Sequence, residues 1–220
     1  MFVSPPLEPR RPIWQSLTRG MAVLLLMTGL FISPVSNLYA QKADPDQALK
    51  LTRELVEATA STLGKSEIDQ EQLDSFHQTL SQALAFGILG DFLLGRHADR
   101  LTDDQRAEYN DLLPDYLTSV FARKLNLVAG REPEILEAEQ FRRDVMVHTR
   151  FYRDDGKTLP VGWRVRVTED GAYKILDVLV GGISIMLLQR EELTAVVANQ
   201  GPPAMLSSMR AAIRRVREDV

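Results

Sequence analysis

Two hydrophobic rhythms divide this sequence of 220 residues. From about residue 44 to 128, apolar residues recur every three or four positions, which is the spacing of one face of an α-helix. From residue 144 to 167 they alternate with polar residues, as in a strand with one buried face. Helical spacing then returns near residue 189. Helices, then strands, then helices again predict an α+β fold.

Capping signals place the first helices. Asp44 stands at an N-cap position before Pro45, and Gln47 can complete a capping box, so we expect a helix from there to Gly64. The stretch from Asp69 to Leu94 has helical spacing throughout and is expected to form one or two helices.

Glycine and proline interrupt the helical region in two places. Gly87, Gly90 and Gly95 indicate either a break in the helix or a surface that another group approaches closely. Thr102 and Gln105 form a second capping box, and Pro114 is expected to bend or divide the helix that follows.

The strands are expected to form an antiparallel meander. Asp144–Tyr152 and Val161–Val167 alternate, with a hairpin signal between them, and a third strand follows the turn at Gly171. That third strand is apolar on both faces, which is typical of a strand covered on both sides. Two helices, Gln189–Asn199 and Met205–Val216, are expected to close the fold.

The first forty residues have the layout of a secretory signal peptide. Arginines at 10, 11 and 19 precede an apolar run from Met21 to Ile32, and Leu38-Tyr39-Ala40 is a possible cleavage site. The run is shorter than the roughly 20 residues of a membrane-spanning helix, although an uncleaved anchor is the alternative. We therefore expect a signal peptide over 1–40 and one α+β domain over 41–220, helical over about 44–128, with the sheet and closing helices over about 140–216.

Charge narrows the possible partners. Without residues 1–40 the chain has 23 basic and 29 acidic residues, a net charge of −6. Nucleic-acid binding would favour the opposite sign, so we expect no nucleic-acid partner. The chain has no cysteine, so an exported form would depend on its core for stability.

Candidate catalytic chemistry is sparse. The three histidines, His77, His97 and His148, are scattered along the chain, and no metal-binding or nucleophile motif occurs. We expect no cofactor and no metal. Asp177 is the unusual residue, because a carboxylate within an apolar strand needs partners. We favour a structural role, with an arginine or backbone N–H groups as its partners, over a role as general base.

Two blocks of sequence resemble the MlaC family, also called the toluene-tolerance family, of periplasmic lipid carriers. The first is LGRHADRLTDDQRAEYNDLLPDYLTSVFARKL, residues 94–125, and the second is VGWRVRVTEDGAYKILDVLVGGISIMLLQREEL, residues 161–193. The resemblance covers about residues 73–213. It implies a nuclear-transport-factor-like α+β cone with an added helical part and an interior pocket for the acyl chains of a phospholipid.

The resemblance also implies partners. These are an inner-membrane ABC transporter with an MCE-type ring and an outer-membrane lipoprotein–porin complex, between which the chain would shuttle lipid through the periplasm. One branch of the family is associated with hopanoid transport, and no residue separates a hopanoid from a phospholipid ligand.

Alternation and helical spacing supply the candidate lipid-binding residues. They are the apolar and aromatic side chains expected to face inward: Phe76, Leu80, Leu84, Phe92, Tyr116, Val120, Val147, Trp163, Val165, Tyr173, Ile175 and Ile183. Arg164 and Arg166 lie on the opposite face of their strand, where a solvated role is favoured over contact with a lipid headgroup.

Two other classes of function fit the same residues. One is an enzyme with Asp177 as base and Tyr116 or Tyr173 as hydrogen-bond donor. The other is a protein-interaction module whose aromatic residues fill a solid core. The sequence leaves open whether the sheet and helices enclose a solid core or a cavity.

Overall fold

The computed structural model describes residues 42–63, 69–125, 133–152 and 156–218. All of them belong to one compact unit, residues 40–220. The proposed signal peptide lies outside the described residues.

Side-chain caps fix where the early helices begin. Helix α1 (Pro45–Leu63) starts after Asp44, whose Oδ1 accepts hydrogen bonds from the backbone N–H groups of Asp46 and Gln47, both at 3.0 Å. The Asp44 N–H donates to the Tyr173 hydroxyl at 3.1 Å, not to Gln47, so the expected box is only half formed. This bond instead ties the start of α1 to the sheet.

The helical stretch 69–94 is two helices, and glycine does not cause the division. Helix α2 (Gln70–Ala83) ends where Leu84 adopts an extended backbone and bridges to Ile175, and the Ala85 N–H donates to the Ile175 carbonyl at 3.3 Å. Helix α3 (Phe86–Leu94) follows directly. A tertiary contact with the sheet therefore divides this stretch.

Gly90 is a site of close approach. The Tyr109 hydroxyl donates to the Gly90 carbonyl at 3.0 Å, and a Cβ at Gly90 would lie 3.0 Å from Leu113 Cδ2. Both partners are on α4 (Asp103–Leu125), which follows a 3₁₀ turn, η2 (Gly95–Arg100). The capping box at Thr102 is confirmed. Pro114 lies inside α4 and does not divide it; the alternative, a bend at Pro114, stays a prediction.

Within the described residues, five antiparallel strands form one sheet in the order of the sequence. The three expected strands are present as β2 (Asp144–Tyr152), β3 (Thr158–Val167) and β4 (Tyr173–Val180). Two more were not expected: the exposed edge strand β1 (Glu134–Phe141) and the short β5 (Ile183–Ser184). The α+β class is confirmed.

The last two helices begin earlier than the sequence pattern indicated. Helix α5 (Ile185–Gln200) starts at the N-cap Ser184, whose Oγ accepts from the Leu187 N–H at 2.9 Å. Helix α6 (Pro202–Glu218) begins with Pro202 and Pro203. Proline suits the first turn of a helix, where its missing N–H has no partner to lose, so these prolines start a helix as well as following one.

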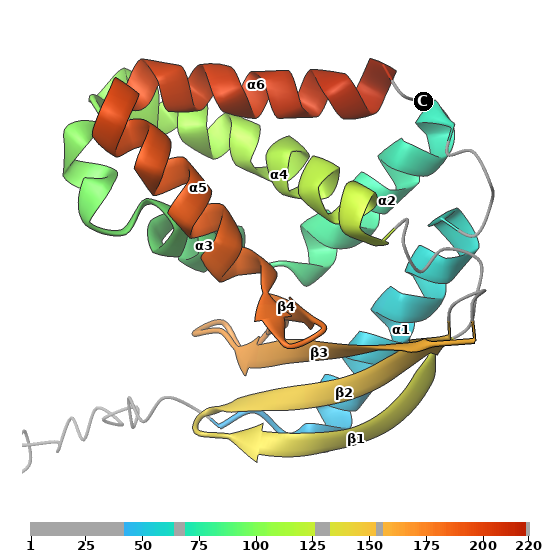
Figure 1. Ribbon diagram of the computed structural model, residues 1–220. Helices are drawn as coiled ribbons and strands as arrows, with labels where there is room; N and C mark the ends of the chain where they lie inside the picture. Colours follow the sequence, from blue (N-terminus) through green and yellow to red (C-terminus); the bar gives the residue numbers. More distant parts are fainter. Residues whose placement is uncertain (1–41, 64–68, 126–132, 153–155, 219–220) are drawn as a thin grey trace, which may run out of the picture. The chain divides into compact units, whose positions relative to one another are not determined.

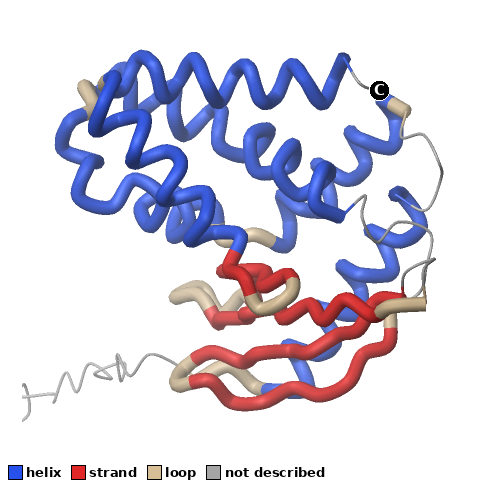
Figure 2. The backbone as a smooth tube through the Cα atoms, in the orientation of Figure 1, coloured by secondary structure: helices blue, strands red, loops and turns tan. Residues whose placement is uncertain are grey.

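The elements form a sheet layer and a helical layer (Figures 1 and 2). Helix α1 packs against β1 and β2 and reaches β3 and β4, whereas α4 packs on α6, and α3 and α6 both pack on α5. The helical layer α2–α6 adjoins the sheet chiefly at β4, through α2 and α5. The buried core lies between the sheet layer and the helical layer, and α1 contributes buried residues to it.

Candidate functional site

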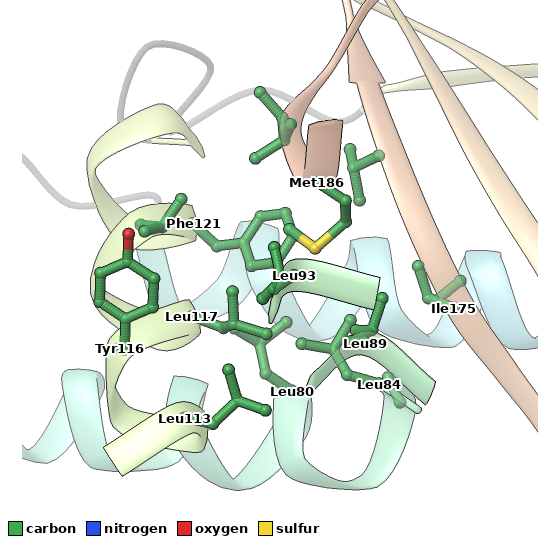
Figure 3. Packing of buried hydrophobic residues seen from close by; sticks show 14 of the residues in the cluster. Leu80, Leu84, Leu89, Leu93, Leu113, Tyr116, Leu117, Phe121, Ile175 and Met186 are labelled. Carbon is green, nitrogen blue, oxygen red and sulfur yellow. The ribbon is translucent and has the colours of Figure 1, made fainter. Parts of the chain in front are cut away.

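The candidate site is the apolar interior between the sheet and the helices. Figure 3 shows its helical side, where Leu80, Leu117 and Phe121 converge from α2 and α4 toward Leu93 of α3. Met186 of α5 lies beside them, and Ile175 of β4 lies near Leu84 and Leu89. Residues from four helices and a strand therefore form one continuous apolar cluster.

The inward face of the sheet forms the other side. Val147 of β2 is directly opposite Trp163 of β3, which is opposite Val178 of β4. Side chains of directly paired residues share a face of the sheet, and all three are buried, as are Val145 and Val165. The alternation in the sequence identified this face correctly.

Most of the residues proposed from the sequence lie in this interior. Nine belong to the buried cluster: Phe76, Leu80, Leu84, Tyr116, Val120, Val147, Trp163, Val165 and Ile175. Tyr173 is partly buried against it. Whether any of them contacts a lipid stays a prediction.

The inward placement of Phe92 and Ile183 was wrong. Phe92 is 38% exposed and Ile183 is 63% exposed. Phe92 lies on the outer side of α3, where the Arg190 guanidinium stacks 4.8 Å from the centre of its ring. Ile183 precedes the N-cap of α5, and no alternation in the sequence fixes its direction there.

Several interior residues were missing from the proposed set. Leu89 and Leu93 on α3, Leu117 and Phe121 on α4, and Met186 on α5 are all buried in the same cluster. Helical spacing marked the first four as apolar, but a helix with apolar residues on several sides does not reveal which side faces the sheet.

The interior contains few polar groups, and most of them have hydrogen-bond partners. The Trp163 indole N–H donates to Thr149 Oγ1 at 2.9 Å, and the Thr149 hydroxyl donates to the Val161 carbonyl at 3.0 Å. The Tyr116 hydroxyl donates to Gln189 Oε1 at 2.6 Å, which joins α4 to α5. Burial raises the pKa of Tyr116 well above its usual range, so this hydroxyl stays protonated.

Two buried hydroxyls are exceptions. Thr52 Oγ1 on α1 and Thr118 Oγ1 on α4 have no hydrogen-bond partner among the residues that the structure describes. An unpaired buried hydroxyl costs about 1–3 kcal/mol. Of these two unsatisfied hydroxyls, that of Thr118 belongs to a residue that lines a small crevice between α2, α4 and α6.

Asp177 has hydrogen-bond partners of the kind that the favoured structural role requires. Its Oδ2 accepts from the Ser184 hydroxyl at 2.6 Å, and its Oδ1 accepts from the Met186 N–H at 3.2 Å. Burial raises the pKa of Asp177, although these hydrogen bonds oppose the change. The carboxylate joins β4 to the start of α5, with backbone N–H groups and a hydroxyl as its partners.

A second charged cluster lies on the outer face of the sheet. Asp144 is fully buried and accepts from Arg164 Nε at 2.6 Å, and from Arg166 Nε and Nη2 at 2.6 and 2.9 Å. Burial acts to raise the pKa of Asp144, but the bonds from Arg166 and Arg164 outweigh it, and the pKa is lowered. Both arginines therefore pair with Asp144 on the outer face of the sheet, where their side chains are partly exposed.

A small crevice between α2, α4 and α6 is separate from the sheet. Asp115 pairs there with His77 Nδ1 and Arg217 Nη2, each at 3.1 Å. The space is about 20 Å³, enough for one molecule the size of water. It has no room for an acyl chain.

The described residues lack two further kinds of feature, a metal-binding cluster and a membrane-spanning helix. They contain no group of His, Cys, Asp or Glu side chains arranged to hold a metal ion. None of the helices in this part of the chain combines the length and apolar character needed to span a bilayer.

Comparisons with known proteins identify the family. The chain is similar in structure to the phospholipid-binding protein from Ralstonia solanacearum in complex with a phospholipid, with a TM-score of 0.61 and 16% identity over 79% of this chain and 99% of that one. A comparison with curated proteins gave no match. A family model described as MlaC protein matches residues 40–211. This chain therefore belongs to the MlaC family.

Proposed function

We propose that this protein is a periplasmic carrier that binds the acyl chains of a phospholipid between its sheet and its helical layer. The observation that carries the proposal is the continuous apolar interior, which unites strands and helices of a chain of the MlaC family. The solved structure of similar fold is that of a phospholipid-binding protein in complex with a phospholipid. That binding is extended to this chain as part of the proposal.

Simple energetics support a carrier. Burial of one CH₂ group is worth about 0.8 kcal/mol, so two long acyl chains together gain roughly 20 kcal/mol or more. A lipid therefore leaves a bilayer readily only for a slot of similar apolarity. The interior offers such surface from Trp163, Val165 and Phe76, all buried, and shuttling requires no nucleophile.

The side chains named above are buried in one cluster in this structure, and we propose that lipid uptake separates the two layers. Separation is easiest where few contacts cross. The helical layer adjoins the sheet chiefly at β4, where Leu84 bridges to Ile175. We propose that β4 remains attached while α4 moves away from β2 and β3. Tyr116 and Val120 on one side and Val147, Trp163 and Val165 on the other would then line the slot.

The remaining parts of the proposal follow from the family. Residues 1–40 act as a cleaved export signal and residues 41–220 form the lipid-binding domain. The carrier receives lipid at one membrane complex and releases it at another. The partners are an inner-membrane ABC transporter with an MCE-type ring and an outer-membrane lipoprotein–porin complex.

Lipid extraction tests the proposal directly. The mature chain, purified from cells, is expected to carry one phospholipid per molecule in native mass spectrometry, and the extracted lipid is identified by its mass. A hopanoid in place of the phospholipid would select the hopanoid alternative. Protein that neither retains lipid nor takes it up from phospholipid vesicles contradicts the carrier function.

A pair of variants tests the location of the slot. Val120→Phe adds volume at a buried position on α4, and Ala195→Phe adds the same ring on the exposed side of α5. Lipid occupancy is expected to fall several-fold in the first variant and to stay unchanged in the second. Circular dichroism and thermal unfolding establish that both fold, because overpacking costs about 1–3 kcal/mol. Equal occupancy in a folded Val120→Phe protein would place the slot elsewhere.

A further inference from the structure

The crevice between α2, α4 and α6 combines a small space with a buried hydroxyl that has no partner. Thr118 of α4 lines this crevice and is only 4% exposed. Its Oγ1 makes no hydrogen bond to any residue that the structure describes. An unpaired buried hydroxyl lowers the stability of a fold, and here it belongs to a residue beside a space of about 20 Å³.

Other threonines on the helices satisfy their hydroxyls within their own helix. Thr59, Thr79 and Thr194 each donate to the carbonyl four residues earlier, at 2.7–3.0 Å. Thr118 makes no such bond to Pro114, the residue four positions before it. Threonine in a helix divides between two rotamers because its hydroxyl can bond to the preceding turn. The Thr118 hydroxyl is therefore available to a group outside its own helix.

The crevice has the polar groups that a buried water molecule requires. Asp115 lines it one turn before Thr118 and supplies a carboxylate acceptor. Ser119 also lines it, and because its hydroxyl donates to the Tyr116 carbonyl at 2.7 Å, its oxygen can still accept. A buried water makes about three hydrogen bonds. One carboxylate and two hydroxyls provide that number.

The charges around the crevice favour a neutral occupant. Asp115 pairs with His77 Nδ1 of α2 and with Arg217 Nη2 of α6, each at 3.1 Å. Asp74, a second carboxylate that lines the space, accepts from Gln70 Nε2 at 2.8 Å. The guanidinium opposes binding of a small cation and the two carboxylates oppose an anion, whereas water both donates and accepts.

We propose that this crevice binds one water molecule, which accepts from the Thr118 hydroxyl and donates to the Asp115 carboxylate and to Ser119 Oγ. Helix α4 packs on both α2 and α6, and Asp115 already bonds to a side chain from each of them. The water completes a polar joint among the three helices. The joint is separate from the sheet and does not depend on the carrier function proposed above.

A crystal structure of the mature chain, at a resolution that shows ordered water, tests the site. One water within hydrogen-bond distance of Thr118 Oγ1 and the Asp115 carboxylate is expected. In Thr118→Val, which keeps the shape of the side chain, this water should be lost while the pairs of Asp115 with His77 and Arg217 remain. A dry crevice in the wild type, an ion in it, or a Thr118 hydroxyl bonded to the Pro114 carbonyl overturns the proposal.

Unfolding in urea provides a second test with an opposite sign for its control. Thr118→Val removes a partner of the bound water, so its equilibrium constant for unfolding should rise about fivefold. Thr52→Val is the matched control, because Thr52 is also buried with an unpaired hydroxyl but does not line the crevice. Its unfolding constant should fall. A Thr118→Val protein as stable as the wild type, or more stable, contradicts the water site, and if this variant does not fold, the wild-type crystal structure decides.

Discussion

Alternate residues of β3 lead to two different environments. Trp163 and Val165 are buried in the interior. Among the described residues, their side chains form one hydrogen bond, which the Trp163 indole donates to Thr149. Arg164 and Arg166, between and beyond them, form three hydrogen bonds to Asp144 on the outer face. One strand thus borders an adaptable apolar volume and a fixed ionic cluster.

The difference has a physical basis. Apolar contacts are not directional, so under the proposed function the interior side chains would exchange contacts with one another for contacts with acyl chains at little loss. A buried carboxylate requires its partners at defined positions. We infer that the ionic face, which carries Asp144, Arg164 and Arg166, keeps the sheet rigid, while the opposite face accommodates the proposed ligand. Variants on each face measure the difference between them.

The largest effect is expected for Trp163→Ala. Removal of this buried ring leaves a cavity, and such changes cost about 3–5 kcal/mol of unfolding free energy. Trp163→Phe keeps most of the volume and loses the bond to Thr149, so it should cost about 1–2 kcal/mol. Urea unfolding followed by circular dichroism measures both. Equal losses for the two variants would show that ring volume is unimportant there.

Asp144→Ala comes next. It leaves two guanidinium groups without their acceptor, but both are partly exposed and regain water, so we expect a loss of about 1–3 kcal/mol. Glu134→Ala removes an exposed partner of Arg150 and is expected to cost less than about 1 kcal/mol. If the two variants lose the same free energy in urea, the ionic face is no more rigid than the sheet edge.

The Asp144 effect should also depend on pH in a defined direction. Its pKa is lowered in the folded protein, so its stabilisation is present above the ordinary value of 3.8 and is lost as pH falls through the folded value. The gap in unfolding free energy between wild type and Asp144→Ala should therefore stay constant from pH 7 to about 4 and close below that. A gap that already closes between pH 7 and 5 would contradict the lowered pKa.

Asp177→Asn is expected to cost less than about 1 kcal/mol at neutral pH, because the amide can still accept from the Met186 N–H and contact Ser184. The pKa of Asp177 is raised. Its stabilisation is therefore full below the ordinary value and is lost as pH rises through the folded value. Relative to wild type, the variant should become more stable as pH rises from 3 to 6. Full loss of a catalytic turnover with ligand retained would instead support the enzyme alternative.

The smallest effect is expected for Thr52→Val. This change replaces an unpaired buried hydroxyl with a methyl group of similar shape, so stability should rise by up to about 1 kcal/mol. Val56→Thr, the reverse change at a buried position of the same helix, should lower stability. A loss of stability in Thr52→Val would show that its hydroxyl has a partner in solution.

Local signals in the sequence predicted the local structure well. The caps at Asp44 and Thr102 start helices as expected, and the alternation of Val145, Val147 and Thr149 identified a buried strand face. Strand β1 was missed because its residues are mostly exposed and a bulge near Leu136 breaks the alternation. The division of α2 from α3 was misjudged because its cause, the bridge to Ile175, is 91 residues away.

The sequence by itself determined the α+β order, the starts of α1 and α4 and the inner face of the central strands, since hydrophobic period and capping depend on neighbouring residues. Tertiary structure decided which sides of α3 and α5 face inward, because both helices carry apolar residues inside and outside. It also gave Asp144 its arginine partners and divided the helix at Leu84. These outcomes depend on contacts between residues far apart in the chain, which no local pattern records.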